Sequence, residues 1–349
     1  METRIPPDYA DTVKSNRVLL SLFAAGALAA CSSSVSEPSA ASDVSASPEV
    51  SAPEPVVSEA PAVEWDFFLG SGGQSGRAYR EALALGDDAT ADLLADIALV
   101  PQAEWYGAWQ SADLTVNQVE ALLEDAAEQG KPAVFVVYAI PNLDCATFSE
   151  GGLEFDTYVD WVATVAAAID GHAPYVILEP DALGQLGMCE GQGNRTDMLA
   201  EAAELLDDAG ARVYLDAGNA EWLSVDEAVT RIDLVGTEHL AGFALNVSNF
   251  VATDVSIAYG DQIAEATGLT YVIDTSRNGN GWNGEWCNPP GRALGETPQL
   301  RGEAYLDALL WVKRPGESDG PCQGGPNAGT WWIEYAIELA QNARANTVD

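Results

Sequence analysis

The stretch Tyr175–Asp181, with the sequence YVILEPD, decides the fold class of this chain. Its first four residues are apolar, which is typical of a parallel-sheet strand buried on both faces. Two carboxylates follow at once, and α/β folds keep their active sites at the carboxyl ends of such strands. The earlier run Val134–Tyr138 is built in the same way and leads to Asp144. Two acidic strand ends indicate paired-carboxylate chemistry, which favours hydrolysis of a glycosidic bond.

Strand-like and helix-like segments alternate from Trp65 onward. The predicted strands are Glu104–Trp109, Val134–Tyr138, Tyr175–Leu178, Arg212–Leu215, Gly242–Leu245, Tyr271–Ile273 and Leu309–Val312. The predicted helices include Leu114–Gln129, Phe155–Asp170, Arg195–Ala209, Ser256–Thr267 and Trp331–Ala345. Repeated strand-then-helix order predicts an α/β fold with a parallel sheet. The strand count favours a distorted TIM-like parallel β/α barrel with fewer than eight strands.

Polar residues follow most of the predicted strands. They are Asp144, Glu179, Asp181, Asp216, Asn246, Asp274, Lys313, Glu317 and Asp319. Any one of them could instead cap a helix or lie in a loop. Because the carboxyl ends of parallel strands meet at one edge of the sheet, their number predicts a shared, mostly acidic site. The chain has no glycine-rich phosphate-binding motif, so nothing in it supports a nucleotide site.

The first 63 residues are predicted to lie outside the folded domain. Residues 1–30 carry Lys14 and Arg17 before an apolar run that is shorter than the roughly 20 residues of a membrane-spanning helix, as in a signal peptide. The run ends at Ala30-Cys31 in a pattern that resembles a lipobox, so we expect lipidation of Cys31. An ordinary secretory signal with an incidental cysteine is the alternative. Residues 31–63 are rich in Ser, Pro and Glu and predict a disordered linker, which leaves 64–349 as the catalytic domain.

The charge of the chain restricts its partners. It has 15 basic and 54 acidic residues, for a net charge of −39. Such a surface repels nucleic acid and anionic substrates, fits neutral ones, and suggests adaptation to high salt. Once Cys31 is set aside, an even set of cysteines remains in an exported protein, which predicts two disulfides: Cys145, Cys189, Cys287 and Cys322. With two histidines and no CxxC spacing, we expect no metal site.

Two segments, Val137–Cys145 and Val176–Leu183, resemble signatures of glycoside hydrolase family 6, the inverting cellulases. Further similar segments follow in order: Tyr214–Gly218, Asn246–Phe250, Asp274–Gly279, Glu285–Pro289 and Trp311–Gly320. The resemblance covers roughly residues 65–345. It implies the disulfides Cys145–Cys189 and Cys287–Cys322 and a reaction that needs no cofactor.

The resemblance also implies the catalytic roles. Asp181 matches the general acid, and Asp144 is expected to raise its pKa because like charges close together disfavour ionisation. Asp319 matches the candidate base, which can act through a chain of waters, and Asp216 matches a further carboxylate. An inverting glycosidase needs such an acid and a carboxylate that activates water on the opposite face of the sugar.

Sugar binding is assigned by the same resemblance. Trp222 and Trp286 match positions that stack on glucosyl rings, while Lys313 and Glu317 match positions that bond sugar hydroxyls. The alternatives are core packing for the tryptophans and a solvated strand end for Lys313. Three further candidate substrate-binding residues are Tyr138, Asn219 and Asn246. Four tryptophans could be core or subsite residues: Trp105, Trp282, Trp331 and Trp332.

Two positions depart from the family pattern. Leu143 stands where the family has arginine, and Asn219 stands where it tends to have histidine. Asparagine can bond a hydroxyl but cannot titrate, so activity could be reduced or its pH optimum shifted. These departures keep open a non-catalytic glucan-binding surface lipoprotein. Exo action of the cellobiohydrolase type and hydrolysis of a different neutral polysaccharide stay open as well.

Short loops favour one of these hypotheses. The segment Ser149–Gly152 and the compact stretch Asp274–Pro290 predict an open cleft and therefore internal cleavage. We thus expect a metal- and cofactor-independent endo-β-1,4-glucanase that acts on cellulose or related β-glucans. It is expected to be a monomer without nucleic-acid partners. It is also expected to be secreted and held at the cell surface or outer membrane only through the lipid on Cys31.

Overall fold

The computed structural model of the chain describes residues 63–143, 145 and 151–347. The predicted signal peptide, lipobox cysteine and almost all of the predicted linker lie outside the described residues, as does Asp144. Within the described part, no helix is both long and apolar enough to cross a membrane.

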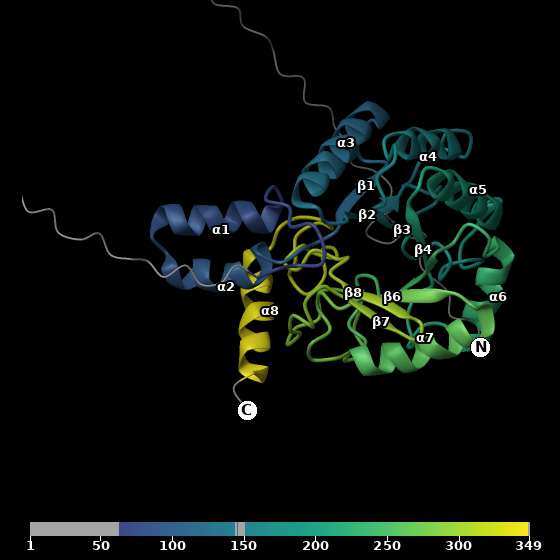
Figure 1. The fold of residues 1–349 in the computed structure, drawn as a ribbon. Helices are drawn as coiled ribbons and strands as arrows, with labels where there is room; N and C mark the ends of the chain where they lie inside the picture. The colour runs from purple at the N-terminus through teal and green to yellow at the C-terminus, as the bar shows by residue number, and fades with distance from the viewer. Residues whose placement is uncertain (1–62, 144, 146–150, 348–349) are drawn as a thin grey trace, which may run out of the picture. The chain divides into compact units, whose positions relative to one another are not determined.

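An eight-stranded sheet forms the centre of the described chain. Its strands are β1 (Glu104–Gly107), β2 (Val134–Tyr138), β3 (Tyr175–Leu178), β4 (Arg212–Asp216), β5 (Gly242–Leu245), β6 (Thr270–Asp274), β7 (Gln299–Glu303) and β8 (Leu306–Leu310). They pair in the order β1-β2-β3-β4-β5-β6-β8-β7, and only the β7–β8 pair is antiparallel. The sheet curls like part of a barrel, with β1 and β7 as its two edges (Figure 1).

Eight helices accompany the sheet in the described residues. They are α1 (Gln74–Leu85), α2 (Asp88–Ala98), α3 (Ala112–Gln129), α4 (Tyr158–Ala167), α5 (Arg195–Asp208), α6 (Val225–Val235), α7 (Thr253–Thr267) and α8 (Ile333–Asn346). Figure 1 shows α3 to α7 in chain order around the outside of the curled sheet, and α1, α2 and α8 together at one side of it. Local capping defines several starts: the Ser111 and Ser224 hydroxyls accept from backbone N–H groups in the first turns of α3 and α6.

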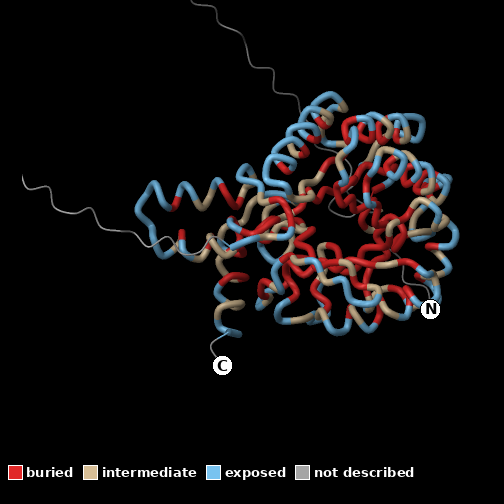
Figure 2. Tube along the Cα trace, in the orientation of Figure 1, coloured by how far each residue is buried: buried red, intermediate tan, exposed pale blue. Residues whose placement is uncertain are grey.

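The main core lies between the sheet and these outer helices. Every residue of β2, β3 and β5 is buried, as expected for strands covered on both faces (Figure 2). A second core joins α2 and α8 through Leu94, Ile97 and Leu339. Trp331 and Trp332 pack against this second core. Both tryptophans thus contribute to packing, which is one of the two roles that the sequence left open for them.

The observed sheet confirms the predicted α/β fold with a mostly parallel, TIM-like sheet. Seven parallel strands agree with the prediction of fewer than eight barrel strands, and β2, β3 and β5 have the predicted bounds. The final parallel strand, β8, begins and ends earlier than predicted. Strand β7 was not predicted, because its sequence QLRGE is polar and partly exposed and pairs only at the sheet edge.

Candidate active site

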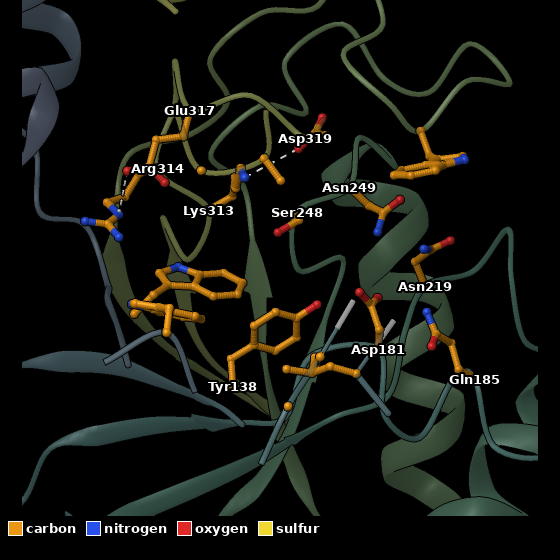
Figure 3. A pocket seen from close by; sticks show the side chains of 18 of the residues that line it. Tyr138, Asp181, Gln185, Asn219, Ser248, Asn249, Lys313, Arg314, Glu317 and Asp319 are labelled. Atoms are coloured by element: carbon orange, nitrogen blue, oxygen red, sulfur yellow. Dashed lines mark ion pairs between the residues drawn. The ribbon is translucent and has the colours of Figure 1, made fainter. Parts of the chain in front are cut away.

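A cleft of about 1040 Å³ lies at the carboxyl ends of the parallel strands. Eight of the predicted site residues line it: Tyr138, Asp181, Asn219, Trp222, Trp286, Lys313, Glu317 and Asp319. Figure 3 shows Asp181, Asn219 and Gln185 on one side of the space and Lys313, Glu317 and Asp319 on the other. The predicted convergence of strand ends is therefore confirmed for these residues.

Asp181 is held in an unusual backbone conformation. Its φ is +70°, in the left-handed region that non-glycine residues rarely adopt. Its N–H donates to Oδ2 of Asp216 at 2.9 Å, and its carbonyl accepts from the N–H of Gln185 at 2.8 Å. Strained residues persist where their surroundings determine them, often at functional sites. Here the two bonds fix the direction in which the Asp181 side chain leaves the β3 end.

Asp216 lies beneath the cleft rather than in it. Only 1% of it is exposed, and Oδ2 accepts from the N–H groups of Asp181 and, at 3.4 Å, Gly218. Burial raises the pKa of Asp216 to about 7, although these backbone bonds lower it, and the nearby charge of Asp274 raises it further. Its Oδ1 has no hydrogen-bond partner among the described residues. Asp216 thus holds the backbone of Asp181. The sequence predicted that Asp216 would face the shared site, but Asp216 does not line the cleft.

Asp319 occupies the opposite electrostatic environment. Its Oδ2 lies 2.9 Å from Nη1 of Arg277, and its Oδ1 lies 3.5 Å from Nζ of Lys313. The N–H of Asn288 donates to Oδ2 at 3.0 Å. Burial alone would raise the pKa of Asp319, but Arg277, Lys313 and this N–H outweigh it and hold the pKa below its usual value. Asp319 is therefore an ionised carboxylate at neutral pH.

Arg277 was not recognised from the sequence. Its side chain is fully buried, and its guanidinium lies over the ring of Phe250 at 4.4 Å from the centroid. Arg277 and Asp319 are 42 residues apart, so no local pattern joins them. The one available signal was the position of Arg277 three residues after β6, at the end of the sheet where the other polar residues gather.

Glu317 is held by two side chains. Nε of Arg314 lies 3.2 Å from its Oε1, and Nε2 of Gln74 donates to the same oxygen at 2.6 Å. Gln74 is the first residue of α1 and also lines the cleft. Lys313, for which the sequence also allowed a solvated strand end, instead contacts Asp319 in the cleft.

Asn246 corrects a prediction. It is fully buried, its Nδ2 donates to the carbonyls of Val251 and Asp274, and its Oδ1 accepts from the N–H of Val251. These bonds use its amide inside the β5 end, so Asn246 does not line the cleft as a sugar ligand. Asp274 acts similarly, since its carboxylate accepts from four backbone N–H groups: Ser248, Ser276, Val312 and Lys313.

Aromatic faces line much of the cleft. Tyr138 meets Trp105 edge-on at 5.3 Å between ring centroids, and Trp105 donates to the carbonyl of Val312. Trp286 and Trp282 are 51% and 41% exposed, so neither is a core residue. Trp105 and Trp282 line the cleft, so both belong to the site and not to the core alone.

Trp222 packs against the backbone of the β3 loop. A Cβ at Gly184 would come within 2.6 Å of the Trp222 ring, so the glycine is what allows the ring to lie there. Trp222 is partly exposed and lines the cleft. Its ring is therefore a fixed surface of the site, beside Asn219, which is its near neighbour in the chain.

Both predicted disulfides are present. Cys145–Cys189 joins the segment after β2 to the loop after β3, and Cys287–Cys322 joins the residue after Trp286 to the loop after Asp319. The two departures from the family pattern also lie at the site. Leu143 is buried and lines the cleft, and Oδ1 of Asn219 accepts from the N–H of Glu221 at 3.0 Å.

An acidic, tryptophan-lined cleft at the carboxyl edge of a curled parallel sheet is typical of glycoside hydrolases. Glycosyl hydrolases family 6 matches residues 68–343, and the chain belongs to this family.

Relatives of the chain include proteins named as an endoglucanase and as a cellobiohydrolase. Endoglucanase A of Cellulomonas fimi is 56% identical over 254 residues, which are 72% of this chain but only 56% of that protein. This chain thus matches little more than half the length of that relative. The 1,4-beta-D-glucan cellobiohydrolase C of Emericella nidulans is 27% identical over 317 residues, covering 70% of each chain.

One solved structure is similar over nearly its whole length. It is the endoglucanase Cel6 from Mycobacterium tuberculosis in complex with methyl-cellobiosyl-4-deoxy-4-thio-beta-D-cellobioside. It aligns with a TM-score of 0.75 at 37% sequence identity and covers 81% of this chain and 98% of that chain. The similarity extends the family assignment from sequence to fold.

Proposed function

We propose that this chain is an inverting endo-β-1,4-glucanase that cleaves internal bonds of cellulose or related β-glucans, with Asp181 as general acid. The observation that carries the proposal is the pairing of Asp181 with Asp319 across one aromatic cleft. Asp319 lies beside the cations Arg277 and Lys313, and backbone bonds to Asp216 and Gln185 hold Asp181 after β3 on the same cleft. Two carboxyl groups that line one cleft can serve as the acid and the base of one reaction.

The proposed reaction is a single displacement. Asp181 gives its proton to the leaving glycosidic oxygen as the bond to the anomeric carbon breaks. A water molecule attacks that carbon from the opposite face, and its proton passes to Asp319 directly or through another water. Asp144 lies outside the described residues; we propose that its negative charge raises the pKa of Asp181. Asp216 fixes the backbone of Asp181 and does not contact substrate.

Substrate binding is proposed to use the aromatic and ionic lining. Trp105, Trp222 and Trp286 offer ring faces to glucosyl units, since carbohydrate faces are apolar and pack on aromatic rings. Lys313 and Glu317 are proposed to bond sugar hydroxyls beside these rings. A neutral glucan also avoids the repulsion that this acidic chain exerts on anionic polymers.

Internal cleavage is favoured over exo action. Trp282 and Trp286 on the cleft wall are each more than one-third exposed, which suits an open groove that accepts a chain at any point. The relative named as an endoglucanase is 56% identical, whereas the one named as a cellobiohydrolase is 27% identical. The hypothesis of a non-catalytic binding protein rests on the departures from the family pattern at Leu143 and Asn219. Both proposed catalytic carboxylates, Asp181 and Asp319, are still present in the cleft.

The location of the protein is also a proposal. We infer export from the two disulfides, because such bonds form and persist in oxidising compartments. We further propose that Cys31 is lipidated and that this lipid holds a monomeric enzyme at the cell surface or outer membrane. Metabolic labelling with a palmitate analogue tests the anchor, and a Cys31→Ala variant should lose the label and be released.

The proposed function is tested by measuring the loss of viscosity and the release of reducing ends from carboxymethyl-cellulose at low and high salt. The wild type should lower viscosity rapidly, while Asp181→Ala should abolish the effect. Asp208→Ala, at the exposed end of α5, is the matched control and should behave as the wild type. Glucan binding without turnover at any salt concentration would contradict the proposal and favour a binding protein.

A further inference from the structure

Arg195 is a buried cation beside the cleft that the proposed reaction does not use. It is the first residue of α5, and only 1% of it is exposed. Taking a guanidinium out of water is unfavourable unless hydrogen bonds and an opposite charge compensate it. The groups that compensate Arg195 therefore indicate what it organises.

Its hydrogen bonds join the ends of two neighbouring strands. Nη2 donates to the carbonyls of Pro141 and Asn142, at 2.9 and 2.8 Å, in the segment that follows β2. Nη1 donates to the carbonyl of Ala182 at 3.1 Å, the residue directly after Asp181. Because a guanidinium is planar and its donors have a fixed geometry, these bonds set the separation of the two segments.

A buried carboxylate makes the reciprocal connection. Glu179, at the end of β3, is fully buried and accepts from the N–H groups of Ala139 and Ile140 after β2. Burial raises the pKa of Glu179 to about 7, while the backbone bonds and the charge of Arg195 oppose the rise. The ends of β2 and β3 are thus tied twice, by a carboxylate from β3 and a guanidinium from α5.

We propose that Arg195 is a positioning residue: it holds the β2 and β3 ends together so that Asp181 keeps its left-handed backbone and faces the cleft. The inference rests on the proposed function for its kinetic consequence. The link between the two strand ends follows from the described contacts alone. The titratable groups facing Arg195 are Glu179 directly after β3, Tyr158 on α4 and Tyr138 on β2.

Two variants test the kinetic consequence. Arg195→Lys keeps the charge but not the three-bond fork, and Arg195→Met removes both. Activity per folded molecule, with the folded fraction taken from circular dichroism, should fall by about 10- to 100-fold in kcat in both variants, with little change in KM. The alkaline limb of the pH profile should move upward in Arg195→Met and not in Arg195→Lys, because losing a nearby positive charge raises the pKa of the general acid.

A second measurement does not depend on activity. Hydrogen–deuterium exchange should become at least about tenfold faster in peptides covering 137–143 and 179–186 in both variants, because the three-bond link from Arg195 to the carbonyls of Pro141, Asn142 and Ala182 is broken. Exchange in β5 should not change. Arg344→Met, which removes exposed ion pairs between α8 and α2, is the control and should leave both readouts as in the wild type.

The outcomes separate the two proposals. An inactive wild type contradicts the proposed function, while the exchange data still decide whether Arg195 ties the strand ends. Unchanged exchange in both segments overturns the positioning role. The positioning role is also overturned if exchange becomes faster while kcat per folded molecule and the pH profile stay those of the wild type. Arg195 would then link the two segments without affecting catalysis.

Discussion

On the β8 side of the cleft, Asp319 lies between Arg277 and Lys313, whereas on the β4 side the described partners of Asp216 are two backbone N–H groups. Both carboxylates are buried, and burial alone raises the pKa of each. The cations reverse the effect at Asp319, and nothing comparable does so at Asp216. Neighbouring groups therefore shift the pKa of two buried aspartates in opposite directions: Asp319 favours the ionised form of the proposed base, and Asp216, which positions the proposed acid Asp181, favours the protonated form.

The largest expected effect is at Asp181, the residue that Asp216 positions. Asp181→Asn removes the proposed proton donor, so kcat should fall by about 10³- to 10⁴-fold on cellotetraose. A cellobioside with a 2,4-dinitrophenyl leaving group needs little protonation and should lose far less. Initial rates on the two substrates measure this contrast. Equal losses on both would contradict the role of Asp181 as general acid.

Asp319 is expected to contribute to the free energy of unfolding through its ion pair with Arg277. Asp319→Asn leaves the fully buried Arg277 without its carboxylate, which should cost about 3 to 5 kcal/mol of unfolding free energy at pH 7. Asp92→Asn removes an exposed ion pair to Arg344 and should cost at most about 1 kcal/mol. Urea unfolding of both variants measures the difference. The Asp319 contribution should be present above about pH 4 and disappear as pH falls through its lowered pKa.

For Asp216 we expect the opposite pH dependence of the free energy of unfolding. Its folded pKa of about 7 lies above its unfolded value, so its contribution is largest in acid and is lost as pH rises from about 4 to about 7. One pKa unit corresponds to about 1.4 kcal/mol, so the loss is on the order of 4 kcal/mol. Asp216→Asn should flatten the stability profile over that window in urea titrations. Part of the slope should remain, because the pKa of Glu179 is raised similarly. An unchanged slope would show that Asp216 is ionised throughout.

Lys313 gives the smallest expected effect. Its Nζ is 3.5 Å from Oδ1 of Asp319. The other carboxylate oxygen, Oδ2, is closer to its own cation, at 2.9 Å from Nη1 of Arg277, and that ion pair remains when Lys313 is replaced. Lys313→Met should therefore move the acidic limb of kcat/KM upward by less than about one pH unit. It should also raise KM about tenfold if the ammonium bonds a sugar hydroxyl. Lys131→Met, which removes a surface pair with Glu64, is the control and should change neither value.

The sequence predicted those parts of the molecule whose signal is local. β2 and β3 are apolar runs buried on both faces, so composition alone marked their bounds. Strand β7 is polar and depends on β8 for pairing, so it carried no such signal. At the site, strand-end position predicted Asp181 and Asp319 as cleft residues but could not separate them from Asn246, which looks the same in sequence and is turned inward. Arg277 was missed because its ion pair closes a long-range contact.

The two disulfides make the cleft, and not the core, dependent on the compartment where the protein resides. Each joins loops beside the cleft, while the strands and the second core contain no cross-link in the described residues. A chain still in the reducing cytoplasm can thus fold its sheet before its binding loops are secured. We expect thiol reduction to leave far-UV circular dichroism nearly unchanged and to lower glucan turnover severalfold. Disulfide formation would then be the step that brings the folded chain to full glucan turnover.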